Sequence, residues 1–265
     1  MRILISNDDG VYAPGIQALQ RAFAKLGETW VVAPLEEKST TGHSLTLHKP
    51  LRVLNLEREL GKRYFGVSGS PADCIYLATR HLLRAKPDLV VSGINRGANL
   101  GQDIYYSGTV SAAREAAMLE IPALAVSLVI NFKRQQKRGQ DFHYATAARY
   151  AVELARRWKT LAVPNHTLLN LNVPDAPYAK VRGLKSGHQG FRYYEGTVLK
   201  RRDHRGRDYY WVGGMYQGHD RRDETDCDWV ERGYAAVTPI KIDATDTLCL
   251  ARLQERIAAK PGGRR

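Results

Sequence analysis

The first 33 residues constrain the fold more than any other part of the chain. Residues 2–6 (RILIS) are an apolar run of strand length, and the turn-forming residues Asn7-Asp8-Asp9-Gly10 follow directly. A helical pattern of apolar residues begins at Pro14 and ends at Gly27, and residues 29–33 (TWVVA) form a second apolar run. Strand, loop, helix and strand in this order predict a βαβ unit, which requires a parallel sheet and a right-handed crossover.

The same alternation continues downstream. Strand-like runs are expected around 51–54, 64–67, 88–92, 123–128 and 168–173, and helices at 71–83, 109–119 and 145–158. Residues 34–48 and 93–108 are polar or rich in glycine and asparagine, so we expect long loops there. The basic stretch Lys133–Gln140 is the expected flexible insertion. The pattern predicts an α/β fold with a mostly parallel sheet.

The last third of the chain changes character. Residues 193–199 and 209–212 are β-prone and flank the very polar turn Asp203–Arg207, which indicates a hairpin. A helical turn at 228–233, a strand at 234–240 and a short amphipathic helix at 247–257 follow. We therefore divide the chain into a core (residues 1–190), an extended hairpin segment (191–235), and a returning strand with a C-terminal helix and frayed tail (236–265).

The hairpin carries five aromatic residues that would be costly to leave exposed as one patch. Two outcomes are open: the hairpin folds back on its own core, or it packs on a second subunit by exchange of identical arms. We expect the second, in a homodimer or homotetramer. These aromatic residues are Tyr193, Tyr194, Tyr209, Tyr210 and Trp211.

The charge is +13 and unevenly distributed. Residues 1–132 hold 14 Lys/Arg against 12 Asp/Glu, and residues 133–265 hold 26 against 15. The basic half shows no zinc-finger spacing, RNP-like motif or helix-turn-helix, so we expect a solvated basic surface and no specific nucleic-acid partner. Three cysteines without a CxxC pattern exclude a disulfide scaffold and a cysteine zinc site, and no apolar run reaches the roughly 20 residues of a membrane span. We expect a cytoplasmic protein without a membrane partner.

Polar residues follow three of the predicted strands, where α/β sheets bind ligands. Asp8-Asp9 would form a hard-oxygen site for a divalent cation, with a plain turn as the alternative. Residues 92–101 offer asparagine oxygens and glycines, and a long surface loop is the alternative. Ser107-Gly108-Thr109 would either cap the following helix or bind a phosphate at its N-terminus. The fourth cluster is Lys38–Ser44, and no Walker loop is present.

Several stretches of the chain closely resemble the SurE family. They are RILISNDDGVYAPGI (2–16), STTGHS (39–44), GSPADC (69–74), SGINRGANLGQDIYYSGTVSAAREA (92–116), LNLNVP (169–174) and GYAAVTPI (233–240). This resemblance covers nearly the whole chain, and the block from Asn95 to Ala117 is very specific. The chain differs from the usual pattern at Tyr12, where a histidine is more common, and in the basic insert Lys133–Gln140.

The resemblance implies a Rossmann-like three-layer α/β/α core and a metal-dependent 5′/3′-nucleotidase. Such an enzyme removes phosphate from nucleoside monophosphates, with short polyphosphate as a further substrate, and forms dimers or tetramers through C-terminal extensions. The implied ligands of one Mg²⁺ or Mn²⁺ ion per subunit are Asp8, Asp9, Ser39 and Asn95, and the acidic pair is catalytic. Phosphate or substrate contacts fall on Asn95, Asn99, Ser107, Gly108 and Thr109.

Two other functions remain as alternatives. A haloacid-dehalogenase-type phosphatase requires Asp-x-Asp after the first strand, and here the two carboxylates are adjacent. A non-catalytic nucleotide- or nucleic-acid-binding protein would suit the basic charge. The sequence does not identify the general base, and His43 is a candidate for the acid that protonates the leaving group.

Overall fold

A computed structural model describes residues 1–38, 40, 42–130 and 141–258. Within them the strands form one nine-stranded sheet, in the order β3-β4-β2-β1-β5-β6-β7-β11-β8, and a separate pair β9–β10. From β4 to β7 neighbouring strands of the large sheet are parallel, whereas β3 and β11 each run antiparallel to one neighbour. The strands of the large sheet are β1 (Arg2–Ser6), β2 (Glu28–Pro34), β3 (Val53–Asn55), β4 (Tyr64–Val67), β5 (Leu89–Arg96), β6 (Ala123–Val129), β7 (Thr167–Pro174), β8 (Leu184–Ser186) and β11 (Ala235–Lys241).

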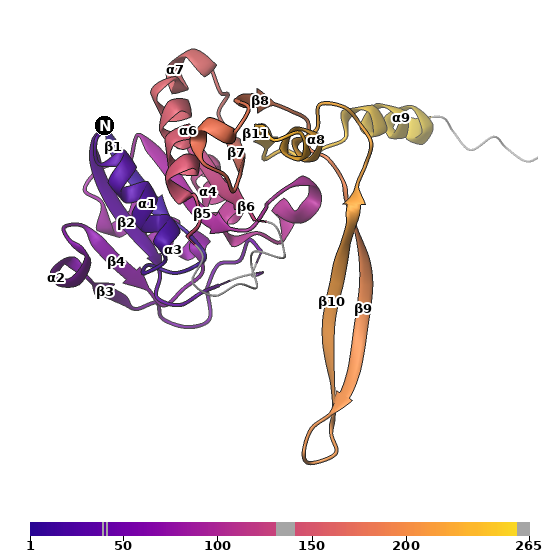
Figure 1. Cartoon of the computed structure of the whole chain (residues 1–265), viewed down its shortest axis with the longest axis horizontal. Coiled ribbons are helices and arrows are strands. Elements are labelled where there is room, and N and C mark those ends of the chain that lie inside the picture. The colour runs from indigo at the N-terminus through magenta and orange to yellow at the C-terminus, as the bar shows by residue number, and fades with distance from the viewer. Residues whose placement is uncertain (39, 41, 131–140, 259–265) are drawn as a thin grey trace, which may run out of the picture.

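Helices cover both faces of this sheet (Figure 1). Side chains alternate along β1, so that Ile3 and Ile5 join one apolar cluster with α1 and α6, while Leu4 joins another with α3 and α4. The predicted Rossmann-like three-layer α/β/α fold is therefore confirmed. The helices are α1 (Pro14–Phe23), α2 (Glu57–Leu60), α3 (Pro71–Leu77), η1 (Ala78–Leu82), η2 (Gly101–Tyr105), α4 (Gly108–Met118), α6 (Tyr144–Arg156), α7 (Trp158–Leu161), η3 (Tyr178–Lys180), α8 (Asp226–Glu231) and α9 (Thr247–Ala258).

The strand order places a topological switch point between β1 and β5. From β1 the chain moves outward to β2 and β4, and it then returns to the other side of β1 with β5, β6 and β7. Loops that leave β1 and β5 at their carboxyl ends therefore diverge to opposite faces, and they leave a crevice in which α/β proteins bind ligands. Asp8-Asp9 and Asn95 lie at this crevice.

One expected loop is partly strand. Gly93–Arg96 continues β5 and pairs with β6 through Val126, Ser127 and Leu128, with an irregularity between Gly93 and Asn95. Gly93 has a φ of +136° and lies so close to the carbonyl of Val126 that a Cβ would overlap it. Glycine and asparagine suggested a loop because their local preferences favour turns, but the neighbouring strand supplies hydrogen-bond partners that override this preference.

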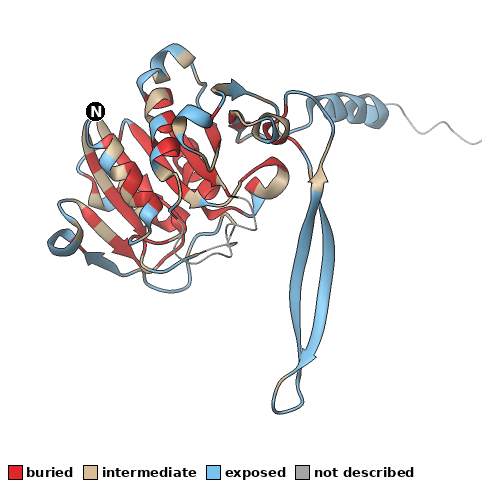
Figure 2. Cartoon of the chain, in the orientation of Figure 1, coloured by how far each residue is buried: buried red, intermediate tan, exposed pale blue. Residues whose placement is uncertain are grey.

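The predicted hairpin is present and longer than expected. β9 (Arg192–Arg202) and β10 (Asp208–His219) pair only with each other and project far from the core (Figure 1). Figure 2 shows that nearly all of their residues are exposed. The alternative in which the hairpin folds back on its own core is therefore wrong. The division of the chain at residues 190 and 235 stays a prediction.

Two further expectations concern membrane-spanning helices and the basic insert and tail. Among the described residues, no helix has the length and apolar character of a membrane span. The insert Lys133–Gln140 and the tail Lys260–Arg265 lie outside the described residues.

Candidate active site

Two adjacent carboxylates lie directly after β1. Asp8 is 5% exposed, and one of its carboxylate oxygens accepts a hydrogen bond from the hydroxyl of Thr109. Burial raises the pKa of Asp8, and burial together with the charge of Asp8 raises the pKa of Asp9 to about 7. Two desolvated like charges side by side are costly unless a cation neutralises them. The pair therefore has the electrostatic character of a cation site.

The start of α4 packs against this pair. The side chain of Ser107 accepts a hydrogen bond from the backbone of Val110 at 3.1 Å, so the helix-capping interpretation of Ser107 is confirmed. A Cβ at Gly108 would lie 2.7 Å from the Cβ of Asp8, which is too close for any other residue without a shift. Gly108 and Thr109 therefore both act on the position of Asp8. Their predicted contact with phosphate stays a prediction.

The end of β5 provides the third side of the site. Asn95 donates its amide nitrogen to the carbonyl of Gly97 at 3.0 Å, which leaves its amide oxygen as the atom suited to a cation. The backbone nitrogen of Arg96 donates to the carboxylate of Asp9 at 3.3 Å. Asp8, Asp9 and Asn95 thus meet at the crevice, although 86 residues separate Asp9 from Asn95 in sequence.

The donor set fits a small hard cation. Two carboxylates and a neutral amide oxygen are ligands that Mg²⁺ and Mn²⁺ accept. Within the described part of the chain, no group of three or more His, Cys, Asp or Glu could hold a metal ion, so a site here must combine the acidic pair with neutral oxygens. Ser39 lies outside the described residues. Its neighbour Lys38 donates its backbone nitrogen to the carbonyl of Asp8 at 2.7 Å.

A cavity of about 960 Å³ opens over these residues, within the usual range for ligand sites of roughly 300–1,000 Å³. It joins the predicted residues to others that sequence reasoning missed. No local signal could identify the hairpin residues among them, because they come from more than 80 residues further along the chain. The cavity is lined by Asp9, Glu37, Thr40, Asn95, Arg96, Ala98, Asn99, Asp103, Tyr106, Ser107, Tyr194, Val212 and Gly214.

Asn99 lines the cavity but also holds a buried network. Its side-chain nitrogen donates to Ser127 at 2.8 Å, and its backbone carbonyl accepts from Asn170 and Asn172 at 2.8 and 2.9 Å. Asn170 and Asn172 on β7 thereby hold the loop after β5 in place through the backbone of Asn99. The geometry supports a positioning role for Asn99, and its predicted substrate contact stays a prediction.

His43 is paired with a carboxylate. Its Nε2 lies 2.8 Å from Glu115, whose side chain is 7% exposed, on α4. His43 does not line the cavity among the described residues. The His43–Glu115 pair links the loop after β2 to α4. Its role as leaving-group acid stays a prediction.

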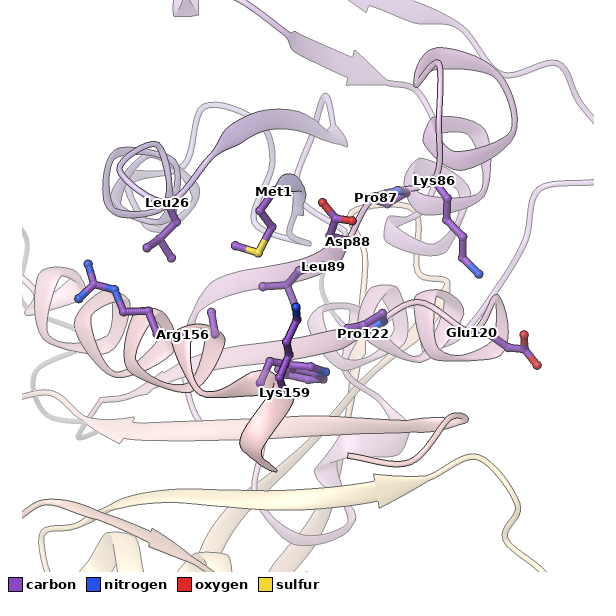
Figure 3. A pocket seen from close by; sticks show the side chains of 12 residues that line it. Met1, Leu26, Lys86, Pro87, Asp88, Leu89, Glu120, Pro122, Arg156 and Lys159 are labelled. Atoms are coloured by element: carbon purple, nitrogen blue, oxygen red, sulfur yellow. The ribbon is translucent and has the colours of Figure 1, made fainter. Parts of the chain in front are cut away.

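A second cavity of about 780 Å³ lies at the opposite, amino-terminal edge of the sheet (Figure 3). It is lined by Met1, Leu26, Leu89 and Trp158 together with charged residues at its rim. Of its two carboxylates, Asp88 accepts a hydrogen bond from the backbone of Arg2 at 2.6 Å, and Glu120 pairs with His166 at 3.3 Å. This cavity lacks a buried acidic pair, so we place the candidate active site at the other edge.

Comparisons with known proteins identify relatives of this chain and a solved structure with the same fold. Residues 3–196 match the family model described as "Survival protein SurE". A protein of Geotalea daltonii named 5′-nucleotidase SurE is 47% identical over 255 residues, which cover 96% of this chain and 98% of the relative. Its counterpart in Geobacter sulfurreducens is 47% identical over 96% of this chain and 93% of the relative. The crystal structure of SurE from Aquifex aeolicus superposes with a TM-score of 0.82 at 36% identity, covering 97% of this chain and all of that one.

Proposed function

The chain belongs to the SurE family, and from this premise we propose that it is a metal-dependent 5′-nucleotidase whose active site is the cavity lined by Asp9 and Asn95, with Asp8 adjacent to Asp9. The observation that carries the proposal is the buried acidic pair at the switch point of the sheet. A bare pair of carboxylates would repel a phosphate, whereas the same pair with a bound cation attracts it. A second candidate, a binding protein without catalysis, has no specific observation in its favour.

The described residues divide the work of phosphoester hydrolysis. A divalent cation, when bound, supplies positive charge to the phosphoryl oxygens and lowers the pKa of water. Asp8 and Asp9 provide the anionic ligands, and Asn95 adds a neutral oxygen. The family resemblance implies Ser39, which lies outside the described residues, as a further neutral ligand. Thr109 holds the carboxylate of Asp8 in place, and Gly108 allows α4 to approach it. The start of α4, where N–H groups and the helix dipole favour anions, provides the phosphate site.

A substrate panel tests this function directly. The full chain is assayed with 5′- and 3′-nucleoside monophosphates and short polyphosphate, with EDTA and with added Mn²⁺ or Mg²⁺. We expect hydrolysis of 5′-monophosphates that EDTA abolishes and metal restores. Binding of nucleotides without release of phosphate under any metal condition would contradict the proposal and favour the binding protein.

We also propose that the hairpin joins subunits in a homodimer or homotetramer. An isolated two-stranded hairpin is marginal in water, yet β9 and β10 expose Trp211 at 63% and Val212 at 83%. The C-terminal helix α9 is likewise exposed along its whole length, including Leu248 and Ile257. Light scattering at micromolar concentration measures the assembly, and a monomeric mass would contradict it.

The cysteines bear on location. Cys74, Cys227 and Cys249 are all free thiols. Unpaired thiols fit the reducing cytoplasm in which we expect this enzyme to act.

A further inference from the structure

The root of the hairpin is part of the catalytic cavity. Tyr194 on β9 and Val212 and Gly214 on β10 line it together with Asp9 and Asn95. Tyr106, from the segment before α4, lines it as well and is 67% exposed. One cavity therefore has Asp9 of the acidic pair in one part of its wall and two tyrosines in another.

Tyr194 is held by a charged partner. Its hydroxyl donates to the carboxylate of Asp103 at 2.6 Å, and the guanidinium of Arg192 binds the same oxygen of Asp103. The guanidinium also lies 5.3 Å from the ring centroid of Tyr194 and 4.3 Å from that of Tyr216. Hydrogen bonds to ionised partners are about twice as strong as neutral ones, so the orientation of the Tyr194 ring is well defined.

The backbone reinforces this anchorage. Gln102 donates its side-chain nitrogen to the carbonyl of Arg192 at 2.5 Å and accepts from the backbone nitrogen of Arg192 at 2.8 Å. The hairpin root is thus fixed to η2, which directly precedes the Ser107–Thr109 segment. Tyr194 nevertheless keeps 42% of its surface accessible, although Tyr216 packs against its ring with the ring centroids 5.9 Å apart.

We propose that Tyr194 recognises the nucleobase of the substrate by stacking, and that Asp103 and Arg192 are the residues that position its ring. This inference rests on the proposed nucleotidase function. A nucleoside monophosphate is an anion at one end and a flat aromatic group at the other, which matches the two parts of the cavity wall. Stacking accepts any base, because every base has a π-face. The enzyme should therefore distinguish nucleotides from sugar phosphates more strongly than one base from another.

The adjacent tyrosine provides a matched control. Tyr193 is 49% exposed, similar to Tyr194, but successive residues of a strand point to opposite faces. The ring of Tyr193 packs against that of Phe191, with the ring centroids 5.5 Å apart, and Tyr193 does not line the cavity. Substitution of either tyrosine removes the same aromatic surface from the same strand, and only one removes it from the cavity.

The test compares two substrates of the full chain in saturating Mn²⁺: adenosine 5′-monophosphate and ribose 5-phosphate, which lacks only the base. The readout is the ratio of their kcat/KM values. We expect Tyr194→Ala to lower this ratio at least about 10-fold, mainly through a higher KM for the nucleotide. Tyr193→Ala should leave the ratio as in the wild type, and Tyr194→Phe, which keeps the ring, should lower it less than Tyr194→Ala.

A second pair of variants tests the positioning role of Asp103. Asp103→Ala removes the acceptor for the Tyr194 hydroxyl, so the ratio should fall. Asp103→Asn keeps an oxygen that can accept this hydrogen bond, so the ratio should recover at least in part. If Asp103→Ala and Asp103→Asn show the same ratio of kcat/KM values, the positioning role is overturned.

The outcomes separate this inference from the function on which it rests. A wild-type ratio near one, or equal losses for both substrates in Tyr194→Ala, would overturn base recognition while the nucleotidase function stands. Failure of the wild type to hydrolyse either substrate in added metal would instead overturn the proposed function.

Discussion

The strands β1 and β10 differ in how far other elements of the same chain bury their side chains. Ile3, Leu4 and Ile5 of β1 are fully buried because helices of the same chain cover both faces of the sheet. Trp211 and Met215 of β10 are also apolar and remain exposed, since the described part of the chain provides no layer against them. The core is thus complete within one chain, whereas the hairpin has an apolar surface that only another molecule can cover. The two regions meet at the proposed active-site cavity, where the core supplies charge and Tyr194 of the hairpin supplies aromatic surface.

The strongest test of the core side is removal of one acidic ligand. Asp8→Asn or Asp9→Asn should lower kcat/KM roughly 1,000-fold, or about 4 kcal/mol in the transition state, because an anionic ligand is lost. The melting temperature of the metal-free protein should stay the same or rise, since the repulsion between the two buried carboxylates is removed. Glu36→Gln, at an exposed neighbour, is the control. Near-wild-type turnover of both variants in saturating metal would contradict the site.

Glycines provide a direct comparison of the two regions. Gly108→Ala should lower kcat/KM about 10- to 100-fold, because the new Cβ displaces Asp8. Gly213→Ala on the hairpin should change activity less than about 2-fold, since Gly213 does not line the cavity and a Cβ there would meet only the hydroxyl of Thr197, at an ordinary contact distance of 3.9 Å. Steady-state kinetics of both variants check this. Equal activity of the two would show that the close approach of α4 to Asp8 is unimportant.

Metal binding should stabilise the folded core, and this effect can be measured independently of catalytic activity. Mn²⁺ at about 100 times its dissociation constant adds about 2.7 kcal/mol to the free energy of unfolding, which should raise the melting temperature by roughly 5 °C or more. The Asp8→Asn variant should show a much smaller shift. Scanning calorimetry with and without EDTA measures both proteins, and an identical shift would place the metal elsewhere.

The smallest effect on the core is expected from shortening the hairpin. Replacing residues 199–211 with Asn-Gly joins Val198 to Val212, which face each other, and keeps Tyr194, Val212 and Gly214 at the cavity. The mass in light scattering should fall to that of a smaller species, while the melting temperature of the core changes by no more than about 2 °C. An unchanged assembly would show that α9 or another surface joins the subunits.

Local sequence signals predicted most of the architecture. Apolar runs of strand length gave β1, β2, β5, β6 and β7, because strands buried on both faces are continuously apolar. Asp8-Asp9 could be proposed as a site since polar residues after the first strand of a βαβ unit lie at the ligand-binding edge. The short strand β8 and helix α2 were missed, because three or four residues carry too little pattern to be distinguished from a loop.

The roles of individual site residues were harder to predict. Ser107-Gly108-Thr109 could be read as a cap or as a phosphate cradle, and the structure adds that Thr109 binds Asp8 and Gly108 packs against it. These contacts join residues about 100 positions apart in the chain. No local propensity encodes them, because they depend on how the start of α4 packs against the loop after β1.

The sequence by itself determined the succession of the longer strands and helices along the chain, the mostly parallel sheet, the hairpin and the edge at which the acidic pair lies. It did so because hydrophobic periodicity and turn chemistry act over a few residues. Only the tertiary structure decided that Asn99 is hydrogen-bonded to Asn170 and Asn172 beneath the site. It also decided that Tyr194 is held at the cavity by a hydrogen bond to Asp103, 91 residues away in the sequence. Such contacts form when separate elements dock, and their specificity lies in the shape and charge of the assembled surfaces rather than in any segment of the chain.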